Sequence, residues 1–267
     1  MDAFITRQLK VPDWQQDKIT NAVILVLGVG GVGSNVAACA IRLGPKKMYL
    51  LDFDVVDDHN LNRQTLYSRA DIGKRKVDAA AATLNALHSL GTEVIPLHFD
   101  AVKEWGRVVA LIQEATVVFN GIDVGQYFDI AVGAMCRKQR IPYGAASTYA
   151  VSALIDFFTN DGNDKPCVCC ANPGKDKLVS AKLHESLIAT YSDLSGVITH
   201  DEKPATGSVG SYVVVAGVGS QMLVQAWLKF LQGHPVPTWT SLNMVEWGAV
   251  TQFSVEQDPA CLACKNV

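Results

Sequence analysis

The sequence has no excess of charge of either sign and no recognisable export signal. Its net charge is −3 over 267 residues, which gives no reason to expect attraction to nucleic acid or to a membrane surface. The opening Met-Asp-Ala-Phe lacks the basic start and long apolar core of a signal peptide. These absences argue against secreted and nucleic-acid-binding classes and predict a cytoplasmic location.

A membrane-spanning segment and internal repeats are missing too. The most apolar stretch, residues 212–231, is interrupted by Gln221, Gln225 and Lys229, which favours a buried helix over a membrane span. No low-complexity tract is present. We therefore predict a single domain over residues 1–267 that does not enter a membrane.

Short apolar runs alternate with helical stretches in the first part of the chain. This alternation is typical of an α/β protein with a doubly wound, mainly parallel, Rossmann-like sheet. Two later runs, joined by Gly248-Ala249, predict antiparallel C-terminal strands. Strands are expected at residues 23–27, 48–51, 94–97, 117–120, 141–143, 151–158, 241–247 and 250–255, and helices at 34–43, from Lys74 to about Leu90, and from near Gly125.

A glycine-rich turn, Gly-Val-Gly-Gly-Val-Gly-Ser at residues 28–34, follows the first apolar run. A strand that enters a helix through such a turn leaves backbone N–H groups free to bind phosphate. Gly28 permits the tight turn, Gly30 lets a phosphate approach, and Gly33 lets helix and strand pack closely. Asp52 lies about twenty residues further on, where a carboxylate can accept hydrogen bonds from ribose hydroxyls. Alone, this pattern favours NAD.

The residues after Asp52 favour a nucleotide with more charge. Basic side chains at residues 74–76 lie at the start of an expected helix, where they oppose the helix dipole. A solvated basic turn is one interpretation of them. Together with Asn60 and Arg63, however, Lys76 would surround a triphosphate with donors and positive charge, which stabilise phosphoryl or nucleotidyl transfer.

Asp123 follows the buried run at residues 117–120. Ligands of open α/β sheets bind at the carboxyl ends of the strands, and a carboxylate there can hold Mg²⁺ together with phosphate oxygens. The alternative is a loop aspartate that caps the helix beginning near Gly125.

Four of the seven cysteines form two pairs with metal-ligand spacing: Cys167 with Cys170, and Cys261 with Cys264. Each pair closely follows a proline, which suggests exposed knuckle turns. Two such pairs in an intracellular chain indicate a tetrahedral Cys₄ zinc site, and two redox or disulfide pairs are the alternative. Cys169 could replace a neighbouring ligand or stay free.

Taken in order, these motifs resemble those of the MoeB/ThiF family, the relatives of ubiquitin-activating enzymes. The resemblance covers essentially the whole chain and implies one ThiF-type adenylation domain, with a nucleotide-binding part (1–160), a crossover and zinc-knuckle segment (161–211) and a C-terminal part (212–267). It rests on the glycine loop and on Thr-Arg-Gln-Leu at 6–9, Leu-Asp-Phe-Asp at 51–54, Asn-Leu-Asn-Arg-Gln at 60–64, Gly-Lys-Arg-Lys at 73–76 and Gly-Ile-Asp at 121–123.

The family pattern implies adenylation, in which a C-terminal carboxylate attacks the α-phosphate of ATP and releases pyrophosphate. The usual substrate is a small β-grasp protein ending in Gly-Gly, either ubiquitin-like or a sulfur carrier. Arg7 would reach the active site of a neighbouring subunit, and we expect a homodimer. The pattern implies that Gly28, Gly30, Gly31, Gly33, Ser34, Asp52, Asp54, Asn60, Arg63, Gln64, Lys76 and Asp123 bind ATP and Mg²⁺, that Arg7, Arg63, Lys76 and Asp123 are catalytic, and that Cys167, Cys170, Cys261 and Cys264 hold a structural Zn²⁺.

One absence bears on the step after adenylation. Family members that form a thioester keep a cysteine in the crossover segment, and residues 171–211 contain none. We therefore predict an enzyme that adenylates without forming its own thioester, with the long polar segment at 161–210 covering the substrate tail. Alternatives are adenylation of a modified tRNA or of a peptide carboxylate, a catalytically weak docking subunit, and an NAD-dependent oxidoreductase, which would leave Arg63, Lys76 and the cysteine pairs without a role.

Overall fold

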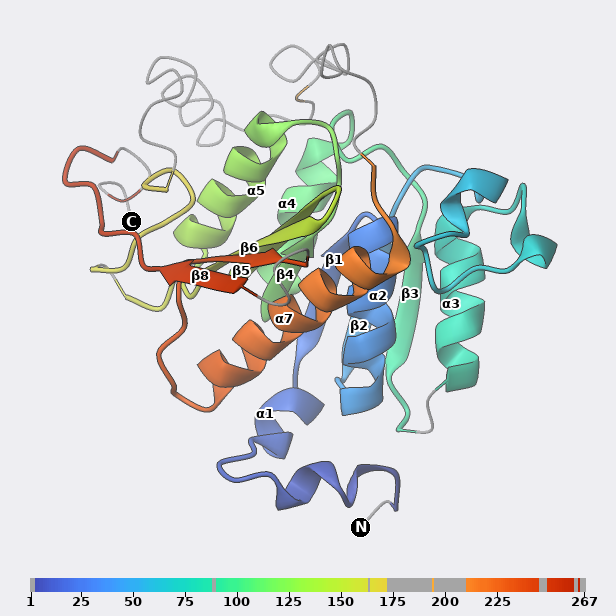
Figure 1. Cartoon of the computed structure of the whole chain (residues 1–267), viewed down its shortest axis with the longest axis horizontal. Coiled ribbons are helices and arrows are strands. Elements are labelled where there is room, and N and C mark those ends of the chain that lie inside the picture. Colours follow the sequence, from blue (N-terminus) through green and yellow to red (C-terminus); the bar gives the residue numbers. More distant parts are fainter. Residues whose placement is uncertain are drawn as a thin grey trace.

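A central sheet organises the protein (Figure 1). The structure, a computed structural model, describes residues 3–87, 90–162, 164–171, 194, 210–244, 249–261 and 264. The strands are β1 (Val23–Leu27), β2 (Lys47–Leu51), β3 (Glu93–Leu97), β4 (Val117–Asn120), β5 (Tyr143–Tyr149), β6 (Ser152–Phe158), β7 (Trp239–Asn243) and β8 (Ala249–Phe253). They form one eight-stranded sheet in the order β3-β2-β1-β4-β5-β6-β7-β8. The strands from β3 to β5 pair in parallel and those from β5 to β8 pair antiparallel, which confirms the predicted fold class.

Helices cover both faces of the sheet (Figure 1). The described α-helices are α1 (Gln16–Thr20), α2 (Gly31–Ala40), α3 (Lys76–Leu87), α4 (Trp105–Glu114), α5 (Gln126–Lys138) and α7 (Val213–Leu231), and the short 3₁₀ helices are η1 (Ala3–Ile5), η2 (Gln8–Lys10), η3 (Ile41–Leu43), η4 (Asp58–Asn60) and η5 (Arg69–Asp71). On one face, Trp105 of α4 and Phe128 of α5 belong to the same buried cluster as Leu25. On the other face, Trp227 of α7 packs with the cluster that contains Val26. Because β1 is buried on both sides, it is apolar throughout, as parallel strands usually are.

The order of the strands places the glycine loop. β1 lies between β2 and β4, so the chain winds in one direction from β1 to β3 and in the other from β4. Loops at the carboxyl end of such a switch point form the usual ligand crevice of a doubly wound sheet. The glycine loop after β1, the loop after β2 and the loop after β4 meet at this edge, whereas η1, η2 and α1 lie at the opposite edge (Figure 1).

Most element boundaries differ from those predicted, although β1 and β4 match to the residue. β5 extends to Tyr149 because it forms a seven-residue hairpin with β6, a partner that its small and polar residues do not announce. α2 begins at Gly31 and ends in η3, and α3 begins only at Lys76, because Arg75 forms a bridge with Val55. Most of the predicted polar segment at 161–210 lies outside the described residues.

α7 is the apolar helix predicted from residues 212–231. It has 19 residues, and an 18-residue window of it has a mean hydropathy of 1.3, so by length and composition alone it could cross a membrane. It packs against α2 and against β5 and β6, and its Ser220 donates a hydrogen bond to the carbonyl of Val32. A buried core helix can have the same length and composition, so the prediction of a core helix agrees with the packing of α7.

Candidate nucleotide and metal sites

The glycine loop is held tightly against the ends of β2 and β4. The N–H of Gly28 donates to Leu51 O at 2.7 Å, and the N–H of Gly121 donates to Leu27 O at 2.7 Å. Gly28 has a φ of +76°, which favours glycine. A Cβ on Gly33 would lie 1.7 Å from the carbonyl oxygen of Gly28. The close packing predicted for Gly33 is therefore a steric requirement of this loop.

Space remains where a phosphate would approach. A Cβ on Gly30 would meet nothing nearer than Gln64 Nε2 at 3.8 Å, and one on Gly31 would meet Arg63 Cδ at 3.5 Å. Ser34 Oγ and Gln64 Oε1 are buried without a hydrogen-bond partner in the described part of the chain. An open loop at the start of a helix, with unsatisfied polar groups beside it, suits the binding of phosphate oxygens.

Asp52 ties the glycine loop to the end of β2. Its Oδ2 accepts from the N–H of Val29 at 2.8 Å and its Oδ1 from the N–H of Asp54 at 2.9 Å. Burial raises the pKa of Asp52, and the positive charge of Lys76 acts in the opposite direction. Each oxygen keeps a further lone pair, so Asp52 has the acceptors that ribose hydroxyls need.

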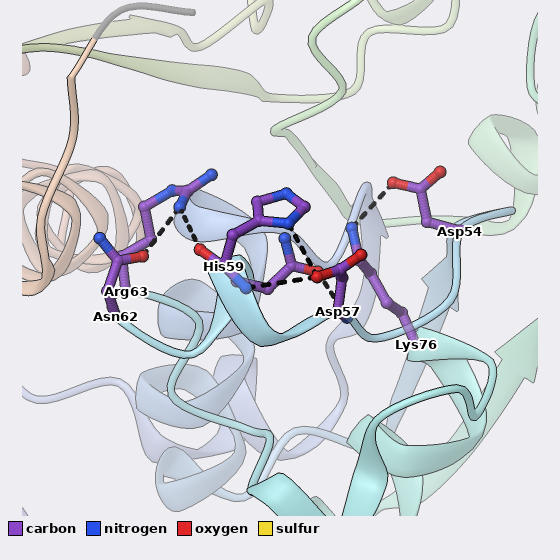
Figure 2. Close-up of polar contacts among 7 residues, drawn as sticks. Asp54, Asp57, His59, Asn62, Arg63 and Lys76 are labelled. Carbon is purple, nitrogen blue, oxygen red and sulfur yellow. Dashed lines mark hydrogen bonds and ion pairs between the residues drawn. The ribbon is translucent and has the colours of Figure 1, made fainter.

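The two predicted cations each already have acceptors within the described part of the chain (Figure 2). Arg63 Nη1 donates to His59 O at 3.1 Å and to Asn62 Oδ1 at 2.8 Å. Lys76 Nζ lies 2.8 Å from Asp54 Oδ2, and only 7% of the Lys76 side chain is exposed. Both cationic groups rise on the same side of the loop in Figure 2. A bound triphosphate would compete with these partners for the two cations.

Asn60 has a structural role that leaves part of its amide available. Its Oδ1 accepts from the N–H of Asp57 at 3.1 Å, as half of a capping box that begins η4. In the described part of the chain, no residue accepts from its Nδ2. Asn60 can therefore shape the loop and still donate to a phosphate.

Asp123 is exposed directly after β4. The N-cap of α5 is Gly125, with no side-chain cap, so the alternative that Asp123 caps this helix is wrong. The turn that carries Asp123 is shaped by Asn120, whose Oδ1 accepts from the N–H of Ile122 at 3.2 Å. An exposed carboxylate at the carboxyl end of a parallel strand suits Mg²⁺, which keeps several waters and takes few protein ligands.

Two carboxyl groups that the motifs did not predict, those of Asp129 and Asp156, lie near Asp123. Asn120 Nδ2 donates to Asp129 Oδ1 at 2.6 Å. Burial, followed by the charges of Asp156 and Asp123, raises the pKa of Asp129 to about 7. Burial also raises the pKa of Asp156 to about 6. No motif in the sequence indicates this pair, because the raised pKa values come from burial in the tertiary structure.

Asp129 makes the stability of the protein depend on pH. Between about pH 4 and pH 7 the folded protein keeps this proton while the unfolded chain has lost it, so the free energy of unfolding falls as pH rises, by about 1.4 kcal/mol per unit at most, and levels off above the folded pKa of about 7. We expect the free energy of unfolding of Asp129→Asn, taken relative to that of wild type, to be larger at pH 8 than at pH 5. Urea unfolding at the two pH values measures this difference. The exposed Glu256→Gln is the control; an equal difference at both pH values for Asp129→Asn would contradict the expectation.

Arg7 does not approach this site within one chain. It is exposed at the start of η2, at the edge of the sheet opposite the glycine loop (Figure 1). A role for Arg7 in catalysis therefore requires a second subunit and stays a prediction.

The fold brings the two cysteine pairs together. The Sγ atoms of Cys167, Cys170, Cys261 and Cys264 all lie within 4.8 Å of one another. Four of the separations are 3.5, 3.6, 3.7 and 3.8 Å. Tetrahedral zinc with Zn–S bonds of about 2.3 Å requires sulfurs about 3.8 Å apart, whereas a disulfide requires about 2.05 Å. The four sulfurs therefore suit a metal better than two disulfides.

The environment of the cluster differs from the predicted exposed turns. Cys167, Cys170 and Cys261 are buried, and Cys169 is partly buried outside the group of four. Hydrogen bonds among the thiols, that between Cys167 and Cys261 first, lower the pKa of Cys261 and raise that of Cys167, so a thiolate in this cluster is stabilised by its thiol neighbours. A thiolate is the form of cysteine that binds metal. The site lies against the α4–α5 side of the core.

Comparison with known proteins agrees with these motifs. Residues 5–263 match the ThiF family. The chain belongs to the ThiF family. It is 28% identical over 211 residues to "Molybdopterin-synthase adenylyltransferase" of Escherichia coli (strain K12), covering 74% of this chain and 81% of that protein. It is 28% identical over 255 residues to "Adenylyltransferase and sulfurtransferase UBA4" of Scheffersomyces stipitis, covering 89% of this chain and 52% of that protein. The predicted family and the predicted enzyme class, an adenylyltransferase, are thereby confirmed.

Solved structures show the same fold. A crystal structure of E. coli MccB with ATP has a TM-score of 0.66 and 20% sequence identity, covering 93% of this chain and 68% of the MccB chain. A further MccB structure, with MccA-N7isoASN, gives a TM-score of 0.69 at 20% identity and the same coverages. At this identity the likeness concerns the fold alone.

Proposed function

We propose that this ThiF-family enzyme adenylates the C-terminal carboxylate of a ubiquitin-like or sulfur-carrier protein ending in Gly-Gly. The observation that carries the proposal is the meeting of the glycine loop, Asp52, Arg63, Lys76 and Asp123 at one edge of the sheet. The relatives are named for adenylyl transfer, and the names of two of them mention molybdopterin synthase and sulfur transfer.

The reaction needs positioning and charge more than it needs a protein nucleophile. An oxygen of the substrate carboxylate bonds to the α-phosphorus, the bond from that phosphorus to the bridging oxygen breaks, and pyrophosphate leaves with the electron pair. A C-terminal carboxylate is ionised at neutral pH, so no base is required. Arg63 and Lys76 would stabilise the phosphate charge, and Asp52 would hold the ribose.

Asp123 and the donors around Gly30 would also orient the phosphates. A Mg²⁺ ion held by Asp123 would neutralise charge on the triphosphate. The four clustered cysteines would hold a structural Zn²⁺ that ties the C-terminal segment to the body of the domain. We place the enzyme in the cytoplasm as a homodimer, in which Arg7 completes the neighbouring site.

The segment at 171–211 contains no cysteine, so we propose that the chain stops at the acyl-adenylate and that another protein accepts the activated carboxyl group. Among the described thiols outside the group of four, Cys169 is the nearest to this segment in sequence, and it lies beside the expected metal ligands.

ATP–pyrophosphate exchange tests this function. The purified chain is incubated with ATP, Mg²⁺, labelled pyrophosphate and a panel of β-grasp proteins that end in Gly-Gly. We expect exchange with at least one intact carrier and none with the same carrier lacking both glycines. Exchange that requires only a short peptide, or a modified tRNA, would assign a different substrate class. NAD binding without exchange under any condition would reject adenylation.

A further inference from the structure

His59 lies in the loop that carries the expected phosphate contacts, yet no motif gives it a role. Its Nδ1 lies 2.9 Å from Asp57 Oδ1, and 72% of its side chain is exposed. Its carbonyl oxygen accepts from Arg63 Nη1 at 3.1 Å. His59 is thus held at two points. The Asp57 carboxylate contacts one ring nitrogen, and Arg63, itself a predicted phosphate-binding residue, donates to the main-chain carbonyl of His59.

The imidazole faces the same space as the two cations. In Figure 2 its ring is seen between the guanidinium of Arg63 and the ammonium of Lys76, and all three groups rise on one side of the loop. Within the part of the chain that the structure describes, no residue bonds to Nε2 of His59. Three basic groups on one side of a loop suit a ligand with several negative charges.

Stability does not explain why the ring is held in this way. A side chain this exposed buries little apolar surface, and exposed ion pairs contribute little to folding. The cap of η4 is made by Asp57 and Asn60 without the imidazole. The hydrogen bond from His59 lowers the pKa of Asp57, so this carboxylate stays ionised and keeps the ring oriented before any ligand arrives.

We propose that His59, oriented by Asp57, binds the β- and γ-phosphates of ATP and stabilises pyrophosphate as it leaves. The proposal rests on the adenylation proposed above. Phosphate oxygens and the Asp57 carboxylate are both acceptors, so the two ring nitrogens of His59 are placed between two acceptors. As the bond from the α-phosphorus to the bridging oxygen breaks, negative charge grows on the pyrophosphate, to which His59 Nε2 would donate a hydrogen bond. His59 is then a catalytic residue and Asp57 a positioning residue.

Binding of ATP and of AMP separates this role from a structural one, because AMP lacks the leaving phosphates. Affinities are measured by calorimetry with Mg²⁺ and without a carrier protein. We expect His59→Ala to weaken ATP binding about 10-fold and AMP binding less than about 2-fold, the loss of one charge-assisted hydrogen bond. His59→Lys places another basic donor at this position and is expected to restore ATP binding to within about 3-fold. Asp57→Asn is expected to lie between wild type and His59→Ala.

A second exposed histidine–aspartate pair in the described part of the chain offers a matched control. His234 Nε2 lies 4.0 Å from Asp13 Oδ2, and His234 follows the C-terminal end of α7. This helix is about 28 Å long. Its N-terminal end lies near the loop of His59, because Asn62 Nδ2 donates to Ser211 O. His234→Ala should leave both affinities unchanged. Equal ATP affinity in wild type and His59→Ala, or equal losses of ATP and AMP affinity, would overturn the role of His59. A wild-type chain that does not bind ATP would instead refute the proposed function.

Discussion

Replacing Asp123 with alanine lowers the rate of ATP–pyrophosphate exchange by about 1,000-fold or more, because the phosphates lose the carboxylate that would hold their magnesium ion. The variant is assayed at saturating ATP over a range of Mg²⁺ concentrations. Raising the Mg²⁺ concentration should recover only part of the rate, since the ion would bind ATP without being fixed to β4.

Two measurements separate loss of the metal ligand from loss of the fold. The exposed side chain of Asp123 makes no hydrogen bond within the described part of the chain, so Asp123→Ala should leave the thermal midpoint and the affinity for AMP without Mg²⁺ close to wild type. Asp17→Ala removes an exposed carboxylate from α1, at the opposite edge of the sheet, and should not change exchange. Unchanged turnover in Asp123→Ala would mean that the metal role is misassigned.

Zinc should be present at about one ion per chain, and its removal should destabilise the protein strongly. Binding of structural zinc by four thiolates contributes about 10 kcal/mol or more in small zinc domains, although thiols of the unfolded chain recover part of this. We expect removal by a strong chelator to lower the thermal midpoint by about 10 °C or more. Metal analysis and thermal unfolding before and after chelation check both expectations.

Substitution of single cysteines tests which sulfurs bind the ion. Cys261→Ser should lose zinc and stability together. Cys39→Ser changes a partly buried thiol of α2 outside the cluster and should keep its zinc. Cys169→Ser should also keep its zinc, because this residue lies outside the group of four. Protein that contains no metal but two disulfides would contradict the zinc assignment.

Much of the fold could be predicted because buried parallel strands are apolar on both faces. β1 and β4 appear in the sequence as uninterrupted apolar runs, and their ends match the structure to the residue. β5 and β7 could not be placed as well, because their small and polar residues become strands only through pairing with neighbours distant in the chain.

The candidate site divides in the same way. The glycine loop, Asp52 and Asp123 are local motifs attached to the ends of strands, so spacing alone indicated them. Asp129 and Asp156 come from α5 and β6, and burial against the sheet gives them their raised pKa values. A sequence carries no direct signal of burial for a single carboxylate.

The amino-acid order alone determined the alternation of strands and helices, the positions of the glycine loop and of Asp123, and the spacing within each cysteine pair, because these depend on neighbours in the chain. Only the tertiary structure decided that two cysteine pairs 94 residues apart meet, that Lys76 faces Asp54, and that the N-terminal segment with η2, which Arg7 precedes, lies at the edge away from the glycine loop. Such contacts depend on how the strands are ordered in the sheet, and that order follows from packing over the whole chain rather than from any local pattern.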